Sequence, residues 1–412
     1  MKHTSITTRQ YAVPFVLITV LFFLWGFARA LLDVLNKHFQ DVLDISITQS
    51  SLIQVSSYLA YFLMAIPAGM FILRFGYRKG VVLGLLLFAA GAFLFIPGAR
   101  MGDFSIYLGA LFIIACGLAF LETAANPYST LLGPAQTATS RLNLSQSFNG
   151  LGSCLGPLLM GGYLFSQTDA DVSLPYIIMG VVVLVVAVIF SRVQLPEITV
   201  QENPSEVSAS GQTPSALSAL KTLLKMPLFV FGLLALLAYE VGEISINSYF
   251  VNFVTGMGWM NAHAASYILG LSLFIFMGGR FIGSWIMRSV PAAKMLYWCA
   301  TGSVVCLVGV ILTSIAEQGS TNGLQYLPIA FLMGNYFCEA IMFPTIFSLA
   351  VEGLGNLTKS ASSILMMTPV GGCGFLLMAL IADRTTLIIP FIIPLLAFGV
   401  VWCYARHKKA IA

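Results

Sequence analysis

The sequence contains little charge, because Asp, Glu, Lys and Arg make up only 9% of its 412 residues. A typical soluble domain carries about 25% charged residues. With 58% hydrophobic residues and a mean hydropathy of +0.91, the chain has more apolar surface than a soluble fold of this size can bury. The composition therefore excludes an ordinary soluble protein and predicts a chain that crosses a membrane many times.

Several kinds of site are also missing. The seven cysteines lie in apolar stretches without a C-x2-C pair, and the four histidines are scattered, so neither a disulfide framework nor a metal cluster is expected. Without a nucleotide-binding loop or a Ser–His constellation, we expect no enzyme and no cofactor. No basic stripe with interleaved aromatic residues is present, so no nucleic-acid partner is expected.

Long apolar runs are abundant, and about 20 apolar residues span a bilayer as one helix. The sequence predicts twelve such helices, at residues 12–36, 48–73, 79–97, 104–132, 142–166, 174–193, 226–254, 263–287, 293–315, 325–352, 359–382 and 386–406. The first run is too long for the core of a signal peptide, so we interpret it as an uncleaved first helix.

The only long polar stretch, residues 194–225, is rich in Pro, Ser, Glu and Gln, which is typical of a linker. It divides the chain into an N-terminal bundle, residues 1–193, and a C-terminal bundle, residues 226–412. Basic residues in short loops favour the cytoplasmic side of a membrane. If both termini are cytoplasmic, the opposite loops keep only Lys37, Arg100 and Arg384, and we therefore predict that orientation.

Three sequence features recur in the same order in the two halves, which indicates an internal duplication. They are the Gly- and Arg-containing loops at 69–79 and 283–294, the Glu-x4-Pro strings that begin at Glu122 and Glu339, and the glycine-rich strings at 152–156 and 371–374. The repeat predicts two similar bundles of six helices, with a binding site between them near the middle of the membrane.

The first of these loops resembles the signature of the major facilitator superfamily, Gly-x3-Asp-Arg-x-Gly-Arg-Lys. The matching residues are Gly69, Arg74, Gly76, Arg78 and Lys79, and the sequence departs from the signature at Leu73, where the family has Asp. The resemblance implies an all-helical transporter with alternating access and assigns Gly69, Arg74, Gly76 and Arg78 to a gating loop. The departure at Leu73 removes a gating ion pair of the family.

A closer resemblance, to the fucose–proton symporter family, runs over nearly the whole chain. It rests on 121–127, 133–134, 141–149, 279–281 and 344–349. It implies symport of a neutral hexose such as glucose, galactose or fucose with a proton or sodium ion, by a monomer in a bacterial inner membrane whose partners are the sugar and the lipid bilayer. The family's acidic pair matches Asp33 and Glu122, and its sugar-contacting amides match Gln146 and Asn149.

The sequence departs from that family before Asp33, where an asparagine-rich run is replaced by 27–32, which includes Arg29. The lost amides argue against fucose itself. The residues do not choose between proton and sodium. An exporter of drugs or other small solutes with the same fold is the alternative function.

Carboxylates inside apolar runs are the main evidence for function. Placing an ionised carboxylate at mid-bilayer costs about 3 kcal/mol of free energy, so such residues normally bind an ion, a proton or a substrate. Asp33 and Glu122 are the candidates for cation coupling. Alternatively, Asp33 forms an ion pair with Arg29 or Lys37, each four residues away on the same helix face. Glu122 has no basic residue at helical spacing, and its alternative role is that of a protonated packing residue.

Amides and one indole are the candidates for sugar binding, because amides both donate and accept hydrogen bonds. With Glu122, the candidate set is Asn126, Gln146, Asn149, Trp25, Asn247 and Asn335. The alternative for the amides is hydrogen bonding between helices.

In the second half, Glu243 and Glu339 each lie four residues from an asparagine, and these oxygens are suited either to sodium or to sugar. They are equally suited to binding water or each other. The sequence assigns no role to Glu240, and it predicts that Arg280 pairs with a buried carboxylate.

Overall fold

The computed structural model describes residues 7–134, 138–166, 171–192, 221–287, 289–317, 326–354 and 357–411, and within them it contains helices and no strand. The first half forms α1 (Ala12–Leu43), α2 (Ile47–Ser50), α3 (Leu52–Phe75), α4 (Tyr77–Phe93), α5 (Phe95–Met101), α6 (Phe104–Leu131), α7 (Ala138–Leu164) and α8 (Ser173–Arg192). The predicted linker lies almost entirely outside the described residues.

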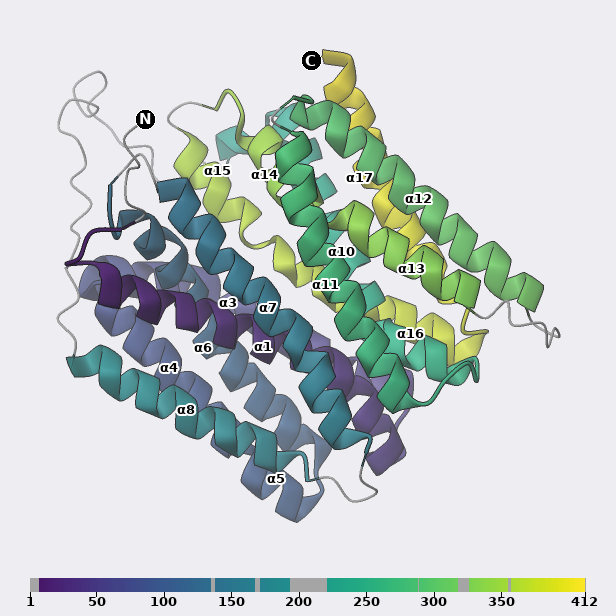
Figure 1. Cartoon of the computed structure of the whole chain (residues 1–412), viewed down its shortest axis with the longest axis horizontal. Helices are drawn as coiled ribbons and strands as arrows, with labels where there is room; N and C mark the ends of the chain where they lie inside the picture. The colour runs from purple at the N-terminus through teal and green to yellow at the C-terminus, as the bar shows by residue number, and fades with distance from the viewer. Residues whose placement is uncertain are drawn as a thin grey trace.

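The second half forms α10 (Pro227–Gly256), α11 (Ala262–Ile286), α12 (Ala292–Glu317), α13 (Tyr326–Glu339), α14 (Met342–Val351), α15 (Thr358–Leu365), η3 (Thr368–Gly374), α16 (Phe375–Arg384), η4 (Ile389–Phe391) and α17 (Ile392–Ile411). Each half has its own hydrophobic core. Figure 1 shows the halves as two groups of helices, purple to teal and green to yellow, that lie side by side.

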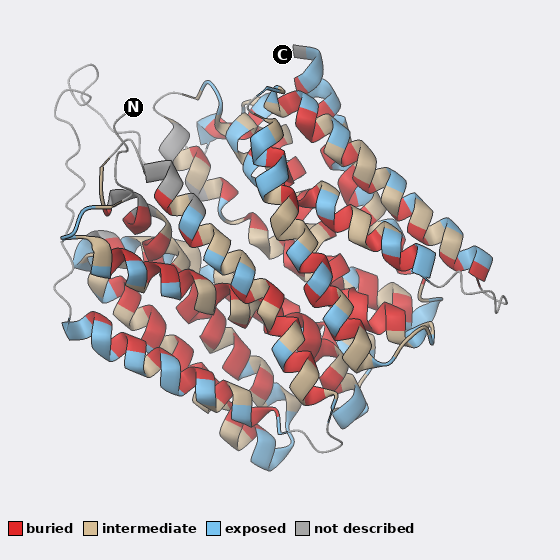
Figure 2. Ribbon diagram, viewed as in Figure 1, coloured by how far each residue is buried: buried red, intermediate tan, exposed pale blue. Residues whose placement is uncertain are grey.

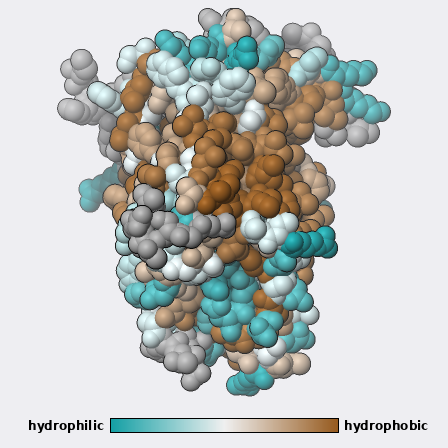
Figure 3. Space-filling view, turned by 90° about the vertical axis from the view of Figure 1, so that its right-hand side faces the viewer, coloured by the Kyte–Doolittle hydropathy of each residue, from teal (hydrophilic) through white to brown (hydrophobic). Residues whose placement is uncertain are grey.

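Ten stretches of the described helices are long and apolar enough to cross a membrane. The two remaining predicted crossings are α7, which is more polar, and the segment of α15, η3 and α16, which consists of short pieces. On α8, Val181, Val185 and Val188 are exposed, as expected of side chains that face lipid. Figure 2 shows buried residues where helices face each other, and Figure 3 shows a largely hydrophobic middle on the face in view.

Local sequence explains where several helices begin. The Asp103 carboxylate accepts a hydrogen bond from Ser105 N at 2.8 Å at the start of α6, and Asn261 does the same for Ala264 N at the start of α11. Pro227 stands at the first turn of α10, where its missing N–H costs nothing. Between α3 and α4, Gly76 has a φ of 87°, a conformation that disfavours other residues.

Several predicted spans differ from the structure, and three of them show how. The first, expected at 12–36, continues to Leu43, and an i,i+4 ion pair between Lys37 and Asp41 at 2.7 Å stabilises the added turns. The tenth, expected as one helix, is interrupted at Ala340–Ile341 between α13 and α14. The eleventh is divided because its glycine-rich centre, η3, forms a 3-10 helix.

The two halves meet along one side of the molecule. With twelve crossings, α1 begins and α17 ends on the same side, called here the terminal side, and the opposite side is called distal. Contacts between the halves join α7 with α11, α1 with α10, α2 with α16, and α3 with η3. The last contact is very close, since a Cβ added to Gly372 would lie 2.3 Å from Tyr58 Cδ2. Because α2 and the end of α1 are distal, the halves are closed against each other on the distal side.

Candidate functional site

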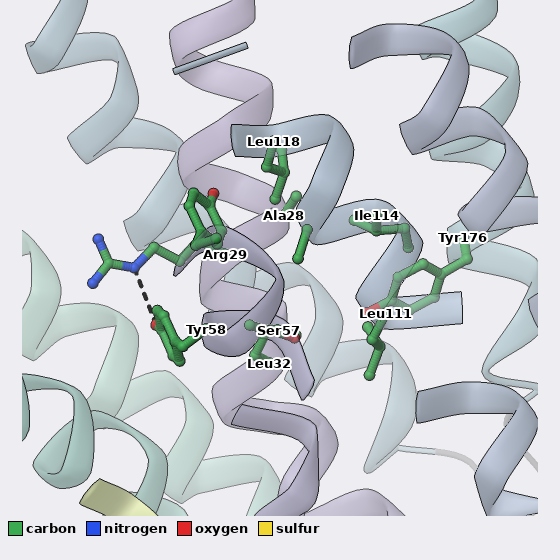
Figure 4. Close-up of a pocket in the computed structure, with 11 residues that line it drawn as sticks. Ala28, Arg29, Leu32, Ser57, Tyr58, Leu111, Ile114, Leu118 and Tyr176 are labelled. Carbon is green, nitrogen blue, oxygen red and sulfur yellow. Dashed lines mark hydrogen bonds between the residues drawn. The ribbon is translucent and has the colours of Figure 1, made fainter. Parts of the chain in front are cut away.

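An ion pair that joins the two halves lies at the centre of the candidate site. Arg29 Nη2 on α1 lies 3.8 Å from Glu240 Oε2 and 3.5 Å from Glu243 Oε2 on α10. Its Nε donates to the Tyr58 hydroxyl of α3 at 3.3 Å, the dashed contact in Figure 4. The guanidinium therefore reaches out of its own half, and the ion pair with Asp33 considered from the sequence does not form in this conformation.

Asp33 takes part in a second link between the halves. Ser248 of α10 donates its hydroxyl to Asp33 Oδ1 at 2.8 Å, and Gln54 Nε2 of α3 donates to the same serine oxygen at 3.0 Å. All three side chains are buried. Lys37, the other predicted partner of Asp33, pairs with Asp41 instead. The hydrogen bond from Ser248 therefore links Asp33 of the first half to the second half.

Glu122 and the predicted sugar-binding amides of the first half lie along α6 and α7. Gln146 Nε2 donates to Asn126 Oδ1 at 3.2 Å, and both side chains are partly exposed. Glu122, one turn before Asn126, is also partly exposed and lies within electrostatic range of Arg29. These three side chains form a polar strip. Because it is reachable, it can exchange its internal hydrogen bonds for bonds to a hydroxyl-rich ligand.

Two other predicted sugar contacts are engaged in packing. Asn149 Nδ2 donates to the backbone oxygen of Phe22 at 3.1 Å, and Trp25 Nε1 donates to the Tyr61 hydroxyl at 3.1 Å. The asparagine therefore holds α7 against α1, which is the alternative role that the sequence left open. The indole is buried in this conformation.

The predicted pairs of the second half form as the helical spacing suggests. Asn247 Nδ2 donates to Glu243 Oε1 at 3.2 Å, and Asn335 Nδ2 donates to Glu339 Oε2 at 2.7 Å. Both asparagine Oδ1 atoms and Glu339 Oε1 are buried without a hydrogen-bond partner among the described residues. Unpartnered buried oxygens are costly, so this part of the protein is suited to a ligand, a proton or water.

The structure contradicts the prediction that Arg280 pairs with a buried carboxylate. Its Nε donates to the backbone oxygen of Ala340 at 3.1 Å, its guanidinium lies over the Phe276 ring at 4.7 Å, and it is in none of the ion pairs found among the described residues. The oxygen it binds is at the interruption between α13 and α14. A helix break leaves backbone oxygens unsatisfied, and Arg280 satisfies one of them.

The loop assigned to gating lies on the terminal side and binds within its own half. Arg78 Nε donates to Phe190 O at 3.2 Å, and its Nη2 binds Ser191 O, which ties the α3–α4 loop to α8. Arg74 is exposed over the Phe75 ring, and a Cβ on Gly69 would meet nothing within 4 Å. This arrangement fits a terminal side on which the halves are apart.

A pocket beside the Arg29 stem is too apolar for a sugar. It is lined by Ser57, Tyr58 and Tyr61 of α3, Tyr176 of α8, and aliphatic side chains of α1 and α6. Figure 4 shows the guanidinium pointing away from it. The sequence analysis missed Gln54, Tyr58, Tyr61 and Ser248. The first three lie three or four residues apart on one face of α3, a polar stripe that the sequence does contain.

The model of the Major Facilitator Superfamily matches residues 18–377. The chain belongs to this superfamily. A glucose/galactose transporter of Brucella abortus is 34% identical over 98% of this chain and 96% of its own length. The L-fucose-proton symporter of Escherichia coli is 31% identical over 98% and 95%. The predicted family and the predicted absence of enzymatic function are confirmed, and this superfamily member is a multi-pass membrane transporter.

Solved structures confirm the fold class of this superfamily member. The transporter FucP in its outward conformation superposes with a TM-score of 0.68 at 29% identity, over 97% of this chain and 99% of that one. A bacterial homologue of the lysosomal transporter Spinster, at 15% identity, gives a TM-score of 0.73 over 97% and 98%. The predicted all-helical fold of two six-helix bundles is therefore confirmed.

Proposed function

We propose that this transporter carries a neutral hexose, glucose or galactose in the first place, together with a proton or a sodium ion. The observation that carries the proposal is the polar strip of Glu122, Asn126 and Gln146 beside a link between the halves through Asp33. Hydroxyl groups of a sugar match these partners, because the amides both donate and accept hydrogen bonds and the carboxylate accepts them. The relatives that transport glucose and galactose, or fucose with protons, support this substrate class.

In this proposal, Asp33 and Glu122 couple the sugar to the cation. Asp33 contacts Ser248 of the opposite half, so its protonation state bears directly on how the halves meet. Glu122 belongs to the same strip as the sugar-binding amides, so one residue serves both ligands. Asn247, Asn335, Glu243 and Glu339 complete the polar wall from the second half, while Asn149 and Trp25 position α1 and α7 around the sugar.

We propose further that residues 1–193 and 226–412 rock against each other as two bundles, joined by a cytoplasmic linker at 194–225. Lys and Arg of the loops favour cytoplasmic termini in a bacterial inner membrane. The distal side is then periplasmic, and the described conformation faces the cytoplasm. One chain contains both bundles, so a monomer suffices for transport.

Uptake into proteoliposomes tests the function. Radiolabelled glucose, galactose and fucose are offered with either a proton gradient or a sodium gradient, and accumulation of glucose or galactose is expected under one of them. Asp33→Asn is expected to lower that accumulation at least tenfold, because the neutral side chain cannot respond to the cation. Exchange of sugar across the membrane without a gradient should continue in this variant.

Glu122→Gln provides the companion measurement, with an expected rise of KM for sugar or a loss of the dependence on the cation. Accumulation by Asp33→Asn equal to that of the unchanged protein would reject the coupling role. Absence of uptake under both gradients, together with binding of lipophilic cations to the protein, would instead support an exporter.

A further inference from the structure

Glu240 and Glu243 form a pair of carboxylates that holds a positive charge supplied by the other half. They lie three residues apart, hence on one face of α10, and their side chains are 5% and 12% exposed. Arg29 Nη2 approaches both, at 3.8 and 3.5 Å, which are ion-pair distances without a tight hydrogen bond. Glu240 Oε2 has no hydrogen-bond partner among the described residues. The Arg29 guanidinium therefore neutralises the carboxylate pair without forming a close hydrogen bond to it.

Arg29 cannot remain on this pair in every state of a transporter that works by alternating access. It belongs to α1 and the carboxylates belong to α10, the same two helices that the Asp33–Ser248 hydrogen bond joins across the interface between the halves. Opening the distal side carries α1 away from α10. The two carboxylates are then left in the interior without their guanidinium, which is strongly unfavourable unless another cation replaces it.

The neighbouring side chains do not supply a cation that could replace the Arg29 guanidinium. The groups within electrostatic range of the pair or of Arg29 are Asp33 of α1, Tyr58 and Tyr61 of α3, Glu122 of α6, Tyr239 of α10, Arg280 of α11, and Tyr336 and Glu339 of α13. Five carboxylates thus face two guanidiniums. Arg280 is held at the oxygen of Ala340, within its own half. The interior keeps an excess of acidic groups in either state.

We propose that Glu240 and Glu243 bind the co-transported monovalent cation, a proton or a sodium ion, and that Arg29 displaces it when the distal side closes. The inference rests on the proposed cation-coupled symport and assigns it a second cation site, opposite Asp33. Asn247 lies beside the pair through its bond to Glu243, and its buried, unpartnered Oδ1 offers one more oxygen.

Displacement gives transport a direction. With the distal side open, Arg29 is absent and the carboxylate pair takes up a cation. With the distal side closed, Arg29 neutralises the same oxygens, and the cation leaves towards the terminal side. The described structure is the state after displacement. A tethered guanidinium thus acts as an internal competitor of the transported ion, and the length of its side chain sets when the competition begins.

The experiment measures how sugar counterflow in proteoliposomes depends on the cation. One series varies pH without sodium, and another varies sodium at fixed pH, so that the two cations are distinguished. Removal of the competitor in Arg29→Gln is expected to shift half-maximal stimulation at least tenfold towards lower cation concentration, with accumulation lowered. Arg29→Lys should restore most of the original dependence. Lys37→Gln is the matched control, because this base of α1 pairs within its own half, and its profile should not move.

The double variant Glu240→Gln with Glu243→Gln tests the site itself. We expect counterflow to continue and its stimulation by the cation to be lost. Stimulation retained by the double variant, an inactive double variant in counterflow, or an unshifted profile in Arg29→Gln would each overturn the proposal. If Arg29→Gln is inactive, the double variant decides. Failure of the symport function is distinguishable, because the unchanged protein would then respond to neither cation.

Discussion

At the scale of single residues, two glycines determine how closely α1 and α7 approach. A Cβ on Gly26 would lie 2.1 Å from Asn149 O, and a Cβ on Gly152 would lie 2.2 Å from Phe23 O. Both obstacles are backbone atoms, which cannot turn aside as a side chain does. The close approach lets Asn149 reach the oxygen of Phe22 and fixes α1, the helix that carries Arg29 and Asp33.

Gly26→Ala is therefore expected to destabilise the first bundle by about 1–3 kcal/mol, the usual cost of overpacking. Thermal unfolding in detergent, followed by circular dichroism, should show a lower midpoint. Gly109→Ala on α6 is the control, because its Cβ would meet nothing within 4 Å. There alanine should be neutral or stabilising, given its higher helix propensity. Equal midpoints for the two variants would contradict the packing argument.

At the scale of elements, the sequence predicts where helices lie better than how they continue. Apolar length alone locates the crossings, and Asp103 marks the start of the fourth. The Glu-x4-Pro strings look equivalent, yet Glu122 lies inside the continuous α6 while Glu339 ends α13. Arg280 of another helix stabilises the break by donating a hydrogen bond to the oxygen of Ala340. Such support comes from tertiary contacts, which a spacing in the sequence does not record.

In the candidate site too, contacts within one helix are predictable from the sequence and contacts between helices are not. Spacing of four residues predicts the bonds of Asn247 with Glu243 and of Asn335 with Glu339, because both partners lie on one helix. The partners of Arg29 and Asp33 lie on α10, in the opposite half, and the spacing along α1 pointed instead to neighbours on the same helix. Pairing across the interface depends on how two bundles dock in one conformation.

A second element-scale feature links the halves at the distal rim. Asp383, at the end of α16 and beyond the predicted eleventh span, accepts hydrogen bonds from Thr48 N at 2.8 Å and Ile47 N at 3.2 Å at the start of α2. Burial acts to raise the pKa of Asp383. The hydrogen bonds from Thr48, Ile47 and Ser46 outweigh it, and the net pKa is lowered below the ordinary value.

Because the pKa of Asp383 is lowered in the closed state, its ionised form favours distal closure at neutral pH. That contribution is fully present above the ordinary pKa of about 4 and is lost as the pH falls through the lowered one. Asp383→Ala should increase the population with an open distal side at pH 7, measured by spin-label distances across the rim. Asp41→Ala, which removes an acid paired within one half, should leave the distances unchanged. A distal rim that stays closed in Asp383→Ala would show that the hydrogen bonds of Asp383 do not hold it closed.

At the scale of the whole molecule, distal closure depends on small residues between α7 and α11. A Cβ on Gly270 would lie 2.6 Å from Leu158 Cγ, whereas a Cβ on Gly278 of the same helix would meet nothing within 4 Å. The bundles can therefore touch at Gly270 only while that position lacks a side chain. Such contacts decide the balance between the two end states of transport.

Gly270→Val should hold the distal side open and slow transport at least tenfold, because the added side chain separates the bundles. Gly278→Val, with an equal change in bulk on α11, should transport normally. Reaction of a distal cysteine probe with a membrane-impermeant thiol reagent would report the open state. Unchanged reactivity in Gly270→Val would show that closure tolerates the added volume.

The contact between Gly372 and Tyr58 limits which substitutions this protein can accept, as well as how its halves move. The ring of Tyr58 rests on the glycine of η3 and holds Arg29 through its hydroxyl, so three positions in three helices share one space. A larger residue at position 372 would displace the tyrosine and with it the guanidinium. At this point neither bundle can change alone, because a larger residue in one is tolerated only with a compensating change in the other.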